Sequence, residues 1–555
     1  MILAYLRGFS VQCLMLGLLF FTASLTPTML PRGPEVQGIL GGLVTALGYL
    51  LGRCVHLLWQ AADMPRLPRR VSRLITWALA LVAVPLFLWA LTSGLTWQND
   101  LRTKMGMDEA DAGHILLILL AAAATLGVAF ALGLVISTVF RLIRGQFYRW
   151  MPPRRANILG VLVVSLLLLI ATRDGLIDSV MTGLDDSYET AQRLFENAPP
   201  APQNAKMTGS SASLIDWSAM GEPGREFVTT GPDAAAISAF TGKAALDPIR
   251  VYVGRANAQT PQERADMALA ELIRVGGFQR EVLIVTSPTG TGWMDPGAHD
   301  PVEYMHNGDI ATVSVQYSYL QSPLALIFET NSGLDQATAL LDTIHTYWKT
   351  LPQDTRPRLY VHGLSLGAWS SMHATNLFRL VDDPINGAFW AGPPFPSRFW
   401  NYVQQARNPG SAWVLPEIEN GSLVRYASHY DGADTARADW GPRRIVFLQY
   451  SRDPVVFYDP WSLFRAPPWM TEPPAPDATQ YMRFIPIVTQ FQLALDMALS
   501  FGAPAGHGHA YYAPDYISPW VEVTDPDEWA AADTERLKQH CNLGVGLGCR
   551  ASESQ

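Results

Sequence analysis

Five apolar stretches fill the first third of this 555-residue chain and restrict what that part can fold into. They lie at about 9–25, 36–59, 74–96, 114–140 and 157–172. The middle three are long enough to cross a bilayer, which takes about 20 residues. The last is shorter and would need its flanking residues to complete a span. A buried helix in a soluble core would explain any one stretch, but five in a row with almost no internal charge predict a membrane domain. We therefore expect about five transmembrane helices over residues 1–173.

The loops between these stretches differ in charge, and the difference predicts an orientation. Arginines gather after the second and fourth stretches, at Arg66, Arg69, Arg70, Arg73, Arg141, Arg144, Arg149, Arg154 and Arg155. The first loop has only Arg32, and the third has Arg102 and Lys104 among four acidic residues. Basic loops stay in the cytoplasm, so we expect a multi-pass protein of the inner (plasma) membrane with a cytoplasmic N-terminus. Everything after residue 173 is then extracytoplasmic, even if the first stretch is a cleaved signal peptide.

The net charge of the rest of the chain restricts the kinds of molecule that it can bind. Residues 1–172 carry a net charge of +8, and the remainder carries −17. An acidic soluble part argues against nucleic acid, because phosphate binding needs clustered positive charge.

The cysteines agree with an oxidising compartment. Cys541 and Cys549 lie in a glycine-rich tail at residues 531–555, and such a pair is typical of a loop-closing disulfide. A metal site would need more ligands than this pair and His540 offer.

Beyond the membrane part, the pattern predicts an α/β fold. Residues 174–213 combine a helix leaving the membrane with a Pro- and Ser-rich linker, and a catalytic domain follows over 214–530. Short apolar runs alternate with longer helical ones, which favours βαβ units and a mainly parallel sheet. The expected strands are Ile249–Val253, Val282–Thr286, Thr312–Gln316, Leu359–His362, Gly387–Ala391 and Ile445–Tyr450. The expected helices are 261–276, 333–350, 365–380 and 482–500.

The pentapeptide 363–367, Gly-Leu-Ser-Leu-Gly, lies between one of these strands and a helix. A G-x-S-x-G sequence there is typical of a nucleophile elbow, in which a sharp turn exposes a serine hydroxyl at the carboxyl edge of the sheet. Gly363 and Gly367 would remove the clashes that the turn creates. The pattern predicts Ser365 as a nucleophile, with a chance turn as the alternative.

A serine hydroxyl needs a histidine to take its proton and an acid to orient that histidine. In this fold the acid and then the histidine follow the serine along the chain. Asp453 comes just after an expected strand, with Asp459 as its nearest rival. His507 and His509 lie in a late glycine-rich loop, and we prefer His509 as the base. A metal site at these two histidines is not expected, because further ligands at usable spacing are missing from the sequence.

An oxyanion intermediate needs two backbone N–H donors. One is expected at Leu366, directly after the nucleophile, and the other in the loop after strand 282–286. We expect Thr289 or Gly290 to supply the second donor. A phosphate-binding loop is the competing interpretation, but this loop lacks the lysine and spacing of a P-loop.

Together these motifs resemble the bacterial membrane α/β-hydrolase family that carries its own N-terminal transmembrane domain. The resemblance runs along the whole chain, through segments 24–32, 37–38, 248–254, 288–293, 316–320, 363–367, 392–394, 451–455 and 506–511. It implies an α/β-hydrolase fold after an α-helical transmembrane bundle, and a hydrolase activity. One departure is Leu364, where the family often has glutamate. The resemblance does not fix a substrate.

The sequence thus predicts a membrane-anchored serine hydrolase, esterase- or lipase-like, that cleaves an ester of a lipid or cell-envelope component without cofactor or metal. Segment 460–474 is a candidate lid, or else an irregular loop, with Trp461, Phe464 and Trp469 available to an acyl chain. An acyltransferase using the same triad remains open, as does a non-catalytic binding or scaffold protein. Transport is disfavoured because the spans hold very few ionisable residues.

Overall fold

The computed structural model describes residues 9–65, 68–173, 199–320, 325, 330–375, 383–430, 432–435 and 438–549. The chain forms two compact units. The first combines residues 1–182 with 459–497, and the second combines 183–458 with 498–555. The expected helix over 174–197 lies outside the described residues.

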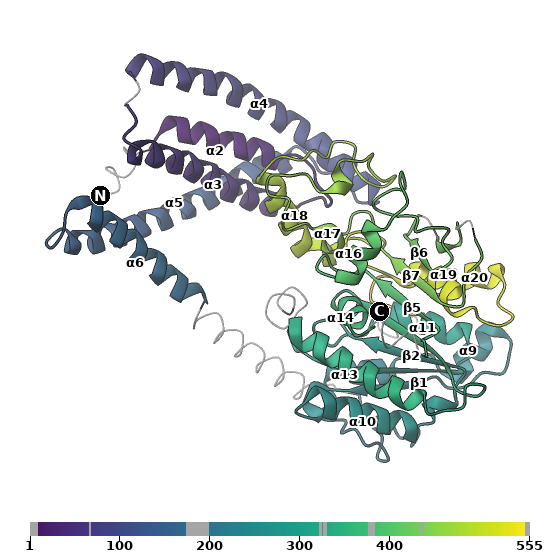
Figure 1. The fold of residues 1–555 in the computed structure, drawn as a ribbon. Coiled ribbons are helices and arrows are strands. Elements are labelled where there is room, and N and C mark those ends of the chain that lie inside the picture. The colour runs from purple at the N-terminus through teal and green to yellow at the C-terminus, as the bar shows by residue number, and fades with distance from the viewer. Residues whose placement is uncertain are drawn as a thin grey trace. The chain divides into compact units, whose positions relative to one another are not determined.

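Among the described residues before 174, the N-terminal unit contains five helices (Figure 1). They are α2 (Val11–Ser24), α3 (Pro34–Ala61), α4 (Arg69–Lys104), α5 (Gly113–Phe147) and α6 (Pro153–Arg173). Three of the described helices, over 34–60, 69–104 and 113–147, are long and apolar enough to cross a membrane, as the sequence predicts for the middle three stretches. Gly38 and Gly42 let α3 approach α5 closely, since a Cβ atom at Gly38 would lie 2.4 Å from Ala121 Cβ. Small residues four apart commonly form such contacts between membrane helices.

A buried polar cluster holds residues 459–497 in this unit. Asp496 in α18 (Val488–Leu499) forms an ion pair of 2.8 Å with Arg32, and both side chains are fully buried. Thr28 Oγ1 also donates to Asp496, at 2.6 Å, and Arg32 donates to Gln37 at 3.0 Å. The loop between α2 and α3 is therefore fixed to a segment that comes between Asp453 and His509 in sequence. We expected this segment within residues 214–530, and the structure groups it with the N-terminal helices.

The second unit is built on a seven-stranded sheet in which all neighbouring strands run parallel (Figure 1). Its order is β1-β3-β2-β4-β5-β7-β6, with bounds β1 Ile249–Val253, β2 Val282–Ser287, β3 Ile310–Val315, β4 Arg358–Leu364, β5 Gly387–Ala391, β6 Val424–Ala427 and β7 Arg444–Leu448. The parallel α/β fold is confirmed, and only β6 was not expected. The central strands are continuously apolar because both faces are buried.

Helices cover the sheet in two groups. The helices α10 (Pro261–Arg274), α13 (Thr330–Trp348) and α14 (Leu366–Ala374) contact one another and strands β1 to β4. The second group is centred on α11 (Pro296–Met305) and α19 (Ala513–Thr524), where Trp520 packs on Phe389 at a ring distance of 4.9 Å. The remaining helices are α8 Glu222–Thr229, α9 Ala234–Thr241, α16 Arg398–Gln405, α17 Pro454–Phe457 and α20 Ala531–His540. The carboxyl ends of β4, β5 and β7 meet at one edge, where ligands bind in open parallel sheets.

Candidate active site

Ser365 occupies a strained turn between β4 and α14. Its backbone angles are φ 57° and ψ −125°, a region that residues other than glycine rarely adopt. The two neighbouring glycines are sterically required: a Cβ at Gly363 would lie 2.3 Å from the carbonyl carbon of Gly367, and one at Gly367 would lie 2.1 Å from Ser287 O. The turn thus has the geometry of a nucleophile elbow.

Asp453 and His509 form a buried pair. His509 Nδ1 lies 2.6 Å from Asp453 Oδ2, and both side chains are almost fully buried. The same carboxylate oxygen accepts a hydrogen bond from the Tyr511 hydroxyl at 2.8 Å, and Oδ1 accepts from Val455 N at 2.9 Å. Burial, with the nearby Asp453, raises the pKa of Tyr511 well above its usual value, so the phenol remains a neutral donor. His509 Nε2 finds no hydrogen-bond partner among the described residues, which leaves it available to a reacting group.

Gly392 brings the serine and the histidine to the same place. Ser365 N donates to Ala391 O at 3.0 Å, at the end of β5. The next residue, Gly392, has φ +53°, and a Cβ there would lie only 2.7 Å from His509 Cε1. Ser365 and His509 therefore flank one backbone position at the carboxyl edge of the sheet.

Both residues line one pocket of about 560 Å³, which is a usual size for a small-molecule site. Its wall is largely apolar, with Trp293, Leu364, Ala498, Phe501 and Val545. Leu364 therefore adds apolar surface to this pocket.

Residues 249–537 match the model of the alpha/beta-hydrolase family, and residues 25–232 match the model of that family's N-terminus. This chain belongs to the alpha/beta-hydrolase family. A search of curated proteins and a search of solved structures each returned no match. The predicted resemblance is thus confirmed for both parts of this chain, apart from its bacterial origin.

The candidate acids and bases of this alpha/beta-hydrolase lie in different surroundings. His507 packs against the ring of His429 at 5.0 Å, whereas His509 contacts Asp453. The rival acid, Asp459, accepts a hydrogen bond from Trp461 N in its own turn. His362 lies in the core beside Phe389 and Trp520, away from the pocket, and burial lowers its pKa to about 4.

The backbone N–H groups of the expected oxyanion donors have different hydrogen-bonding surroundings. Leu366 begins α14, so its N–H belongs to the first turn, where helical partners are missing. Thr289 lines the pocket, but its N–H donates to Trp293 O at 3.1 Å and is committed to that turn. Gly290 is not among the described lining residues. The second donor therefore stays a prediction.

Two elements of the site were not predicted from the sequence. Asp295 lines the pocket, caps α11 by accepting from Gly297 N at 2.9 Å, and accepts from the Tyr516 hydroxyl at 2.9 Å. Burial raises the pKa of Asp295 to about 7. Its Asp-Pro sequence is a helix-start signal, but burial beside the pocket is not readable from it. The loop between Cys541 and Cys549, which the structure closes with a disulfide, also contributes to the wall.

Proposed function

We propose that this protein is a membrane-anchored serine esterase that hydrolyses a lipid or cell-envelope ester. Ser365 Oγ attacks the ester carbonyl while His509 Nε2 takes the hydroxyl proton. His509 then gives that proton to the departing alcohol, and a water molecule releases the acid in the same way. Asp453 orients the imidazole through Nδ1 and stabilises its protonated form. The Leu366 N–H contributes to oxyanion stabilisation.

The observation that carries the proposal is the buried 2.6 Å pair of Asp453 and His509, in which His509 lines the same pocket as the strained Ser365. The apolar wall of that pocket suits an acyl chain, and the membrane helices suit a lipid or envelope substrate.

The polarity of the membrane unit supports an extracytoplasmic active site. The α2–α3 loop, which contains Arg32, is fixed to Asp496, and the C-terminal end of α4 approaches the same segment, where Lys104 Nζ donates to Pro476 O at 3.4 Å. The arginine-rich connections after α3 and α5 lie at the opposite helix ends. Basic ends face the cytoplasm, so the end that holds the 459–497 segment faces outward. An export-dependent reporter fused after residue 555 should be active, and a reporter active only in the cytoplasm would overturn this orientation.

Hydrolysis of 4-nitrophenyl butanoate by the full-length protein in detergent tests the activity. Ser365→Ala should abolish turnover, whereas Ser370→Ala, a serine on the same helix that bonds Leu366 O, serves as the matched control. Equal turnover by wild type and Ser365→Ala would reject the proposal.

A further inference from the structure

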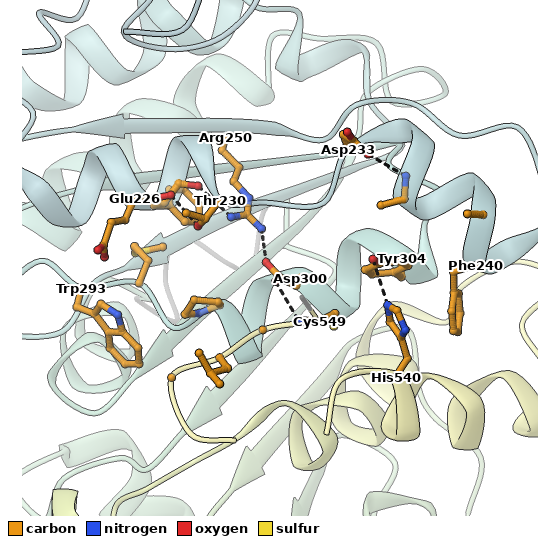
Figure 2. A pocket seen from close by; sticks show the side chains of 18 of the residues that line it. Glu226, Thr230, Asp233, Phe240, Arg250, Trp293, Asp300, Tyr304, His540 and Cys549 are labelled. Atoms are coloured by element: carbon orange, nitrogen blue, oxygen red, sulfur yellow. Dashed lines mark hydrogen bonds and ion pairs between the residues drawn. The ribbon is translucent and has the colours of Figure 1, made fainter. Parts of the chain in front are cut away.

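A second, larger cavity of about 1360 Å³ lies in the catalytic unit and has no part in the proposed chemistry. Its lining includes Glu226, Asp233, Phe240, Trp293, Gln539 and His540. Figure 2 shows aromatic side chains and carboxylates interspersed around it, with Trp293 and Glu226 on one side of the view and Phe240 and His540 on the other. The cavity exceeds the usual volume of a site for one drug-sized ligand, about 300–1,000 Å³.

The two cavities are neighbours. Trp293 and Gly546 line both of them, so the two cavities adjoin at the disulfide loop and one indole. The loop is firmly seated, because Cys549 N donates to Asp300 Oδ2 at 3.1 Å. A Cβ at Gly548 would lie 1.8 Å from the same oxygen. A ligand in the larger cavity would therefore lie next to the pocket of Ser365.

The charges in the lining do not favour an anion. Arg250 is neutralised by Asp300 at 2.6 Å and by Glu303 at 2.7 Å. Arg536 pairs with Asp533 at 2.9 Å, and its guanidinium lies over the Phe240 ring. Burial lowers the pKa of His540, which keeps that ring neutral. The carboxylates of Glu226 and Asp233 and the amide of Gln539 remain in the lining, and these groups can accept hydrogen bonds from hydroxyl groups.

Aromatic rings interspersed with hydrogen-bonding carboxylates complement a sugar, which has apolar C–H faces and a rim of hydroxyl groups. Phe240, which Arg536 covers on one face, and Trp293 offer apolar ring surface, while Glu226 and Asp233 offer acceptors. We propose that this cavity binds the carbohydrate alcohol of the ester substrate while the pocket of Ser365 takes the acyl chain. This inference rests on the proposed esterase function and names its substrate as an acylated sugar.

The proposed reaction can proceed as hydrolysis of a sugar ester or as its reverse. In hydrolysis, the bond between the acyl carbon and the sugar oxygen breaks, the sugar leaves with the proton from His509, and water removes the acyl group from Ser365. In reverse, a hydroxyl of the bound sugar attacks the acyl-enzyme, His509 takes its proton, and a sugar ester forms. The same site would thus support acyl transfer to a sugar.

The test compares 4-nitrophenyl butanoate with 6-O-butanoyl maltose, using the full-length protein in detergent. We expect Glu226→Ala and Phe240→Ala each to lower kcat/KM for the maltose ester, relative to that for the nitrophenyl ester, about tenfold or more, because each removes a contact made only by the sugar. Glu222→Gln, on the same helix as Glu226 but outside the lining, is the control for a general effect on α8. An unchanged ratio in both cavity variants would overturn the inference.

A binding measurement separates this inference from the esterase proposal. Calorimetric titration of Ser365→Ala protein with maltose and with N,N′-diacetylchitobiose should show binding of at least one sugar, and adding Glu226→Ala should weaken it about tenfold or more. Sugar binding without turnover of the nitrophenyl ester would reject the esterase and leave a sugar site. Turnover of the nitrophenyl ester without binding of either sugar would reject the sugar site alone.

Discussion

The contact between Gly392 and His509 gives a quantitative prediction about the candidate triad. A Cβ atom at this position would lie 2.7 Å from both His509 Cε1 and Tyr511 Cε2, whereas ordinary van der Waals contact begins at 3.4 Å. In Gly392→Ala the imidazole must therefore retreat by about 0.7 Å, or the β5 end must shift by as much. A misplacement of about 1 Å in a catalytic group can cost on the order of 100-fold in rate. The left-handed backbone adds about 1–2 kcal/mol of destabilisation.

Steady-state hydrolysis of 4-nitrophenyl butanoate measures this effect. We expect kcat for Gly392→Ala to fall roughly 100-fold, with a smaller change in KM. Gly410→Ala is the matched control, because Gly410 also has a positive φ (+83°) but its Cβ would meet nothing within 4 Å. The two variants should lose similar backbone stability, but only Gly392→Ala should lose activity. If Gly392→Ala kept kcat within threefold of wild type, the placement of His509 beside this residue would be refuted.

Three further predictions concern stability. Burial raises the pKa of Asp295 to about 7 from 3.8, so the folded protein holds a proton that the unfolded chain releases, and stability should fall as pH rises from about 4 through 7. Asp295→Asn should flatten that slope in thermal unfolding at several pH values; an unchanged slope would contradict the assignment. Arg32→Met leaves Asp496 as a buried unpaired charge and should cost about 3–5 kcal/mol, whereas adding Asp496→Leu should restore much of that loss in urea unfolding. Failure of the second substitution to restore stability would argue against the ion pair. Cys541→Ser should cost about 2–3 kcal/mol, because the disulfide closes a short loop, and a reducing agent should lower the Tm of wild type but not of the variant.

The sequence predicted those parts of the fold whose signals are local. Runs such as Val282–Val285 are continuously apolar, and the spacing of the elbow glycines indicates the tight turn that requires them. Strand β6 (Val424–Ala427) was missed because four residues carry too little periodicity. The placement of residues 459–497 with the membrane helices depends on the Arg32–Asp496 pair, whose partners are 464 residues apart.

For the candidate site too, the sequence predicts what depends on local signals and misses what depends on tertiary packing. Chain order predicts an acid and a histidine after Ser365. Asp453 can be selected from local sequence, because it comes just after an expected strand. The choice between His507 and His509 needs the three-dimensional path of the loop, because both lie in the same glycine-rich segment. Asp295 and the loop at Val545 reach the pocket only through tertiary packing, and the sequence alone does not indicate either.

The central claim is that Ser365 is an activated nucleophile, and the most direct measurement is the site of covalent modification by a fluorophosphonate. Full-length protein would be labelled, digested and mapped by mass spectrometry, alongside His509→Ala. We predict one adduct on the peptide that contains Ser365 and strongly slowed labelling in His509→Ala. An adduct on another serine, no adduct in the wild type, or equal labelling of the two proteins would contradict the account.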